Sequence, residues 1–250
     1  MKLSRLILAV FILTLWPVMG LGVLPGIADQ IKKAEERIDS ALWGLEKHGE
    51  LAEALELYQA VAMELESLEV KAQSTDYHEQ QRVLAYAYLR IGNVLRQLGR
   101  SDEALQVGAR ELECAQESGN DIALARTLMN FGTTLLTGGQ VEKGLAYIEP
   151  SRPIFEKGES FDYKQGLGWY WILQAELGLA GIIEAEPKKL LNFLDTALEI
   201  LEPIQNWTGV ARAYGLRAKV HESQGRTGLA AADRKLQAEY QARVDEEMEQ

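Results

Sequence analysis

"GRSDEALQ", residues 99–106, has the composition of a turn followed by the start of a helix. Gly99 can end one helix in the left-handed conformation. Ser101 or Asp102 can then cap the next helix. A related stretch, "GELAEALE", occupies residues 49–56. This recurrence indicates that the chain contains an internal repeat.

The repeat has three fixed positions: a small residue, a turn glycine seven residues later, and an alanine five residues after that. Successive copies begin about 40 to 50 residues apart, which is a spacing typical of stacked helical hairpins. The copy that begins at Leu42 has a large first residue, and the copy that begins at Gly178 is degenerate. The copies are Gly92, Gly99 and Ala104; Gly132, Gly139 and Gly144; Ala218, Gly225 and Ala230; Leu42, Gly49 and Ala54; and Gly178, Ala185 and Leu190.

Helix geometry explains the three positions. The first residue lies where two antiparallel helices cross closely, and a bulky side chain there would separate them. The glycine turns the chain, and the alanine faces the first helix from the second. Apolar residues recur between these positions at helical spacing. The pattern predicts five hairpins, formed by residues 33–48 with 51–72, 79–98 with 102–118, 121–137 with 140–158, 165–184 with 187–203, and 208–224 with 227–249.

These motifs make the chain resemble the tetratricopeptide repeat family over about residues 35–245. That family has small residues at the eighth and twentieth positions of each repeat, and a sequence similar to "GDYEEAL" at the turn. The resemblance implies an all-α fold, a right-handed superhelix (α-solenoid) of about five antiparallel hairpins. First helices would line its concave wall and hold a protein or peptide partner.

Two regions should depart from regular hairpins. Pro150 and Pro153 do not suit the middle of a helix, so the second helix of the third hairpin should be kinked or cut short. Residues 156–166 form the longest stretch expected to be irregular. Residues 231–250 are strongly charged and amphipathic, as expected of a terminal capping helix, which offers one surface for a homo-oligomer.

Composition excludes several classes of protein. Apolar residues make up 47% of the chain and the formal net charge is −11, which is typical of a folded protein that does not bind nucleic acid. The single cysteine, Cys114, excludes an internal disulfide and is expected to be a buried, inert thiol.

The first 28 residues have the layout of a secretory signal. Lys2 and Arg5 precede an apolar run, and Gly26 and Ala28 occupy the cleavage positions. The mature domain would then be residues 29–250, exported to the periplasm or the extracellular space. An uncleaved membrane anchor is the alternative, although the prolines and glycines of the run disfavour a stable spanning helix.

No motif of known catalytic chemistry occurs in the sequence. Phosphate-binding loops, dinucleotide-binding glycines, HExxH and GxSxG are all absent. His48, His78 and His221 lie in different repeats, so they are not expected to converge on a metal. We therefore expect a non-enzymatic protein with no catalytic residues, metal or cofactor.

Exposed positions on the first helices predict a partner-binding groove. In the family that the chain resembles, some members hold a peptide carboxylate at positions matched here by Asn93 and Asn130. Leu89, Ile172 and Glu176 replace the basic residues of that clamp, which argues against it. A polar patch able to hold acidic side chains or peptide backbone remains, although its arginines could instead pair with nearby acids. The predicted groove residues are Asn93, Arg96, Gln97, Arg126, Asn130, Arg212 and Lys219.

The stretch "GWYWI", residues 168–172, is the densest aromatic region. Trp169, Tyr170 and Trp171 point in three directions on a helix, so we expect two to pack between the third and fourth hairpins and one to be exposed. The alternative is that Trp169 and Trp171 anchor a partner.

The sequence thus predicts an exported interaction scaffold or assembly factor of the cell envelope. Two alternatives stay open. One is a small-ligand sensor or solute-binding accessory protein with a pocket near these tryptophans, and the other is a cytosolic regulator of the same fold.

Overall fold

The computed structural model describes residues 25–248, so most of the predicted signal segment, residues 1–24, lies outside the described residues. Eleven α-helices and one short 3₁₀-helix, η1, make up the described part of the chain. Their bounds are α1 (Ile27–Gly44), η1 (Glu46–His48), α2 (Leu51–Ser67), α3 (Thr75–Gln97), α4 (Ser101–Ser118), α5 (Asp121–Thr137), α6 (Val141–Ile148), α7 (Ser151–Phe155), α8 (Phe161–Leu179), α9 (Pro187–Leu201), α10 (Trp207–Ser223) and α11 (Thr227–Met248).

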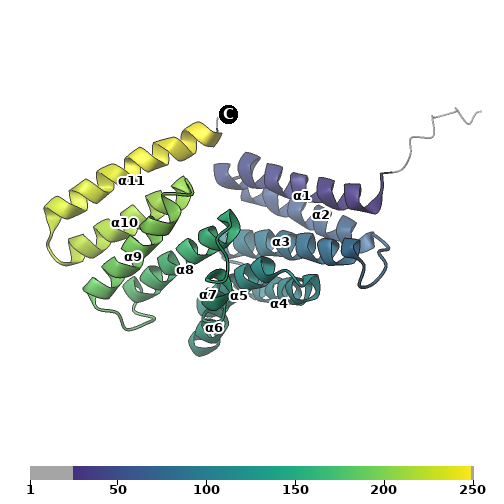
Figure 1. Ribbon diagram of the computed structural model, residues 1–250, viewed down its shortest axis with the longest axis horizontal. Coiled ribbons are helices and arrows are strands. Elements are labelled where there is room, and N and C mark those ends of the chain that lie inside the picture. The colour runs from purple at the N-terminus through teal and green to yellow at the C-terminus, as the bar shows by residue number, and fades with distance from the viewer. Residues whose placement is uncertain (1–24, 249–250) are drawn as a thin grey trace, which may run out of the picture.

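The helices pack in consecutive pairs, as the repeat predicts. Helix α1 packs on α2, α3 on α4, α5 on α6, α8 on α9, and α10 on α11. Each pair also contacts the next pair, so the hairpins follow one another along an arc that brings the end of α11 back near α1 (Figure 1). The all-α architecture of about five hairpins is therefore confirmed.

Positive backbone angles mark the predicted turns. Gly49, Gly99, Gly139 and Gly225 have φ angles of 83°, 72°, 77° and 68°. A side chain is disfavoured at such angles, which explains why glycine recurs at this position. In the degenerate repeat the turn residue is Gly181, with φ 71°, and not Ala185 as predicted.

The third hairpin is interrupted where its prolines predict. Helix α6 ends at Ile148, and Pro150 precedes the separate short helix α7, which contains Pro153. The stretch predicted to be irregular is shorter than expected, because α8 already begins at Phe161. Phe155 fills the space beside α8, where it lies against Gly166 and is 1% exposed.

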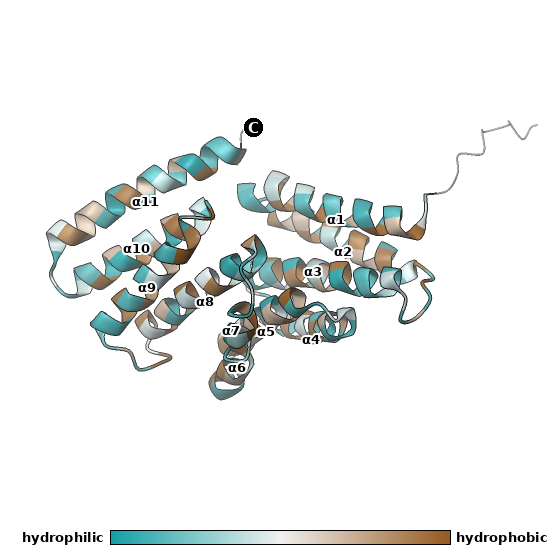
Figure 2. Cartoon of the chain, in the orientation of Figure 1, coloured by the Kyte–Doolittle hydropathy of each residue, from teal (hydrophilic) through white to brown (hydrophobic). Residues whose placement is uncertain are grey.

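Each hairpin contributes apolar residues to a buried core. Figure 2 shows that the helices carry both hydrophobic and hydrophilic residues along their length. The largest buried cluster joins α1, α2, α3 and α4, and a second joins α8, α9 and α10. The predicted capping helix, residues 231–250, forms most of α11, and its residues 231–248 are described. No helix of residues 25–248 is both long enough and apolar enough to span a bilayer.

Candidate binding groove

First helices of the hairpins line one continuous groove, as the repeat pattern predicts. Three cavities of about 580, 470 and 370 Å³ lie along it. The first and second share Leu89, Arg126 and Gln165, and the second and third share Lys47, Arg90, Gln165, Trp169 and Thr208. Here "the groove" means these three cavities, "the floor" means the 470 Å³ cavity, and "the mouth" means the 370 Å³ cavity between α1, α8 and α10.

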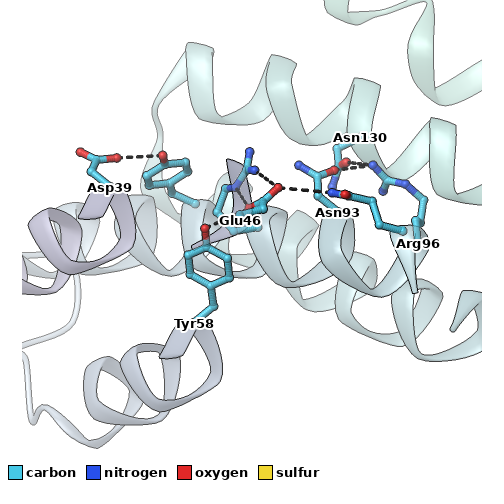
Figure 3. A network of polar contacts seen from close by, with 9 residues as sticks. Asp39, Glu46, Tyr58, Asn93, Arg96 and Asn130 are labelled. Atoms are coloured by element: carbon cyan, nitrogen blue, oxygen red, sulfur yellow. Dashed lines mark hydrogen bonds and ion pairs between the residues drawn. The ribbon is translucent and has the colours of Figure 1, made fainter. Parts of the chain in front are cut away.

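Arg96 is held at the floor by neutral oxygen atoms. It donates hydrogen bonds to Thr134 Oγ1 at 2.6 Å, to Asn130 Oδ1 at 2.8 Å, and to Asn93 Oδ1. Figure 3 shows the Asn93, Arg96 and Asn130 side chains converging from α3 and α5. No carboxylate of residues 25–248 forms an ion pair with Arg96. Three predicted groove residues are thus brought together around one fixed guanidinium.

A buried carboxyl lies behind this cluster. Asn130 Nδ2 donates to Glu111 Oε2 at 2.7 Å, while Glu111 Oε1 has no hydrogen-bond partner. Glu111 is 0% exposed, and burial raises the pKa of its carboxyl to about 8. Burial therefore favours the neutral form of this carboxyl, while the charge of Arg96 acts in the opposite direction on its pKa.

A second polar cluster, centred on Glu46, lies beside the floor and was not predicted from the sequence. Glu46 pairs with Arg90 and accepts a hydrogen bond from the Tyr58 hydroxyl at 2.9 Å. Gln97 Nε2 donates to the same carboxylate at 3.4 Å, which places this predicted groove residue at the edge of the cluster. Burial is the main cause that raises the pKa of Tyr58. The cluster ties η1 to α2 and α3.

Arg126 lines the groove but carries partners of its own. Its guanidinium donates to Asp162 Oδ1 at 2.7 Å and to Gln165 Oε1 at 2.9 Å. The alternative interpretation, that a groove arginine pairs with a nearby acid, therefore holds for Arg126 and not for Arg96.

The other predicted basic residues lie outside the three cavities. Arg212 donates to Glu176 Oε1 at 2.6 Å, and Lys219 is exposed further along α10. Neither residue lines the groove. Ile172 is buried on α8.

The aromatic stretch of α8 is divided between core and groove. Tyr170 is 2% exposed, and Trp171 stacks on Phe193 with ring centroids 5.4 Å apart. Trp169 is half-buried and lines both the floor and the mouth. The expectation of one exposed ring is wrong, because Trp169 and Trp171 both pack against the buried cluster of α8, α9 and α10.

Two aromatic residues at the mouth were not predicted. Trp43 comes from the end of α1, and Trp207 from the start of α10. Their convergence with Trp169 depends on how distant hairpins stack, and no short-range sequence pattern reports it.

Conventional reactive groups are dispersed or shielded. Cys114 is buried, as expected, and desolvation raises the pKa of its thiol to about 12, which disfavours the reactive thiolate. In the part of the chain that the structure describes, no three His, Cys, Asp or Glu side chains are grouped to hold a metal.

Comparisons with known proteins agree with this architecture. Residues 83–157 match the family model described as tetratricopeptide repeat. A crystal structure of BtubC (BKLC) from P. vanneervenii is similar to the chain with a TM-score of 0.55 and 15% identity, over 89% of this chain and 93% of that one. The apo form of RapI is similar with a TM-score of 0.51 and 14% identity, over 90% of this chain and 87% of that one. No curated protein matches the sequence. Residues 83–157 are therefore a tetratricopeptide repeat region, and a TPR-like fold continues on both sides of them.

Proposed function

We propose that this protein is a non-enzymatic scaffold that holds an acidic segment of a partner protein in the groove. The observation that carries the proposal is Arg96, a fixed cation at the floor whose hydrogen-bond partners are all neutral oxygens. Guanidinium groups bind carboxylates through charge-assisted hydrogen bonds, and fixing the donor in advance reduces the entropy lost on binding.

The surroundings of Arg96 support a peptide-like ligand. Leu89, Met129 and Leu173 line the same cavity and offer apolar contact beside the charge. The chain as a whole carries a formal net charge of −11, and such a charge repels acidic segments. The positive charge at the floor therefore favours binding of an acidic segment there rather than elsewhere on the protein. Apolar walls around a few fixed polar groups are typical of binding sites.

Photo-crosslinking in the native host tests this proposal. A photoreactive residue replaces Leu89 in the groove, or Met63, which is 64% exposed on α2. We expect one dominant crosslinked partner from position 89 and none from position 63. Arg96→Gln should abolish the crosslink, while Arg100→Gln should keep it, because Arg100 is exposed and paired with Glu103. A crosslink that survives Arg96→Gln, or that forms only at position 63, would contradict the proposal.

We further propose that the scaffold works in the cell envelope, after export directed by residues 1–28. The charged start, apolar run and small residues at 26 and 28 support this. N-terminal mass spectrometry of fractionated cells should find a chain that begins at Asp29 outside the cytosol. An intact Met1 in the cytosolic fraction would instead support a cytosolic regulator, and an intact Met1 in the membrane fraction an anchored protein.

A small-ligand function is the second candidate, because Trp43, Trp169 and Trp207 surround the mouth. Its volume of about 370 Å³ lies within the range of small-molecule sites. A ligand that binds only the folded state raises the melting temperature. Thermal melts with a panel of solutes should therefore reveal such a ligand, and quenching of tryptophan fluorescence would place it at the mouth.

A further inference from the structure

The end of α11 projects beyond the helix on which it packs. Arg243 lies over the ring of Trp207, 4.9 Å from the centroid, and Trp207 is the first residue of α10. Trp207 also stacks on Tyr240, with centroids 5.5 Å apart. Residues 245–248 therefore continue past the start of α10, and Figure 1 shows them pointing toward α1.

This projecting end is acidic where a helix disfavours negative charge. Asp245, Glu246 and Glu247 occupy the last turn of α11, which is hydrophilic in Figure 2. The negative end of the helix dipole repels carboxylates there. A favourable interaction with another part of the molecule would offset that repulsion.

Lys47 is the cation that faces this end. Glu247, Trp43 and Lys47 line the same cavity, the mouth of the groove. The Lys47 ammonium lies 5.6 Å from the centroid of the Trp43 ring and forms no ion pair with any residue of the described chain. Its pKa is lowered because the surrounding atoms desolvate the ammonium and Arg90 repels it. A carboxylate docked beside Lys47 would counter both effects.

We propose that residues 245–247 are an electrostatic latch, which docks on Lys47 and the face of Trp43 and closes the mouth of the groove. Docking joins the last hairpin to the first and covers one end of the groove. Release opens the mouth, so an acidic partner segment that binds Arg96 and extends past Lys47 would compete with the latch for Lys47. The competition rests on the proposed function, whereas the contact between α11 and Lys47 does not.

Distance measurement by electron spin resonance on the full chain tests the latch without any partner. Cys114→Ala removes the native thiol, and Ser40→Cys on α1 with Ala242→Cys on α11 places two labels at exposed positions. We expect a single narrow distance distribution in this background. Lys47→Glu should move it to longer distances and broaden it, and 1 M salt should do the same, because the Debye length falls from about 10 Å at 0.1 M to about 3 Å.

A charge swap separates a broken latch from a damaged fold. Lys47→Glu combined with Glu247→Lys should restore most of the narrow distribution. The matched control Lys188→Glu, at an exposed position on α9 outside the groove, should leave the distribution unchanged. An unchanged distribution in Lys47→Glu, or a swap that restores nothing, would overturn the proposal.

The two proposals fail in different ways. If the crosslink at position 89 is absent while the distances respond to Lys47→Glu, the latch stands and the scaffold function falls. If the crosslink depends on Arg96 but the distances between the labels do not change in Lys47→Glu, the scaffold function stands and the latch falls.

Discussion

The second and third hairpins carry the same motif and use its first glycine differently. In the third, a Cβ atom added to Gly132 would lie 2.7 Å from the Gly144 carbonyl oxygen and 2.6 Å from Ile148 Cγ1. In the second, a Cβ atom on Gly92 would meet only Asn130 Nδ2, at 3.6 Å. One glycine permits two helices to touch, whereas the other lies next to the amide that bonds Arg96 and Glu111.

The second helices explain the contrast. Helix α4 runs unbroken from Ser101 to Ser118, and Ala104 occupies the motif position that faces α3. Helix α6 has glycine at the equivalent position and ends after eight residues. The close crossing at Gly132 therefore involves a second helix of only eight residues, whereas the regular hairpin has room for buried polar groups.

Among the glycine substitutions, Gly132→Ala should have the largest effect, because backbone and a buried isoleucine block the new methyl group. We expect a loss of about 3 kcal/mol in the free energy of unfolding, at the upper end for overpacked cores. Urea titration followed by circular dichroism measures it. Gly138→Ala is the control at the end of the same helix, since its new Cβ atom would come no closer than 3.4 Å to another residue. Equal losses in the two variants would show that the crossing can relax.

Glu111→Gln should remove the pH dependence that this buried carboxyl of the second hairpin gives to the free energy of unfolding. Burial raises the pKa of Glu111 from 4.5 to about 8, so the folded state holds a proton that the unfolded state releases. Stability conferred by this group is therefore lost as the pH rises from about 4.5 to 8. Relative to Glu111→Gln, the wild-type protein should lose about 4–5 kcal/mol across this range, because each unit of pKa difference is worth about 1.4 kcal/mol.

Parallel urea titrations at pH 5, 6.5 and 8.5 measure this difference. Glu103→Gln is a suitable control, since that carboxylate is exposed on the same helix. A wild-type curve that stays parallel to that of Glu111→Gln would mean that the buried carboxyl is charged in the folded state.

The helical hairpins could be predicted because their determinants are local. Gly49, Gly99, Gly139 and Gly225 each take a left-handed angle, and the turn chemistry of a few neighbouring residues reports this. The break after Ile148 follows equally from the restrictions that Pro150 and Pro153 impose. Ala185 was mistaken for a turn residue because its repeat has lost the regular spacing.

The groove could be predicted only in part. Asn93, Arg96 and Asn130 occupy matching faces of successive first helices, so helical periodicity brings them together. Whether an arginine finds an acid depends on neighbours far away in sequence, as the pairing of Arg126 with Asp162 shows. Lys47 and Glu247 are still further apart along the chain, and only the accumulated rotation of five hairpins places them at one cavity.

Gly92→Ala should have the smallest effect on the free energy of unfolding. Whether this variant is more or less stable than the wild type shows whether the second hairpin has room for a side chain at this motif position. Glycine inside a helix costs about 0.5–1 kcal/mol relative to alanine, because it loses more backbone entropy on folding. Since the new methyl group would make an ordinary contact with Asn130, we expect the variant to be more stable than the wild type by up to this amount. The urea midpoint should rise with an unchanged slope.

The same variant reports on the groove, because the methyl group would lie 3.6 Å from the Asn130 amide nitrogen that bonds Glu111. If stability rises and the crosslink at position 89 is kept, glycine is required at this motif position neither by the helix crossing nor by the site. If stability falls, the Asn130 amide does not tolerate even an ordinary neighbour at 3.6 Å. The cluster around Arg96 would then be as rigid as the helix contact at Gly132, which is the rigidity that a fixed cation needs to select one ligand segment.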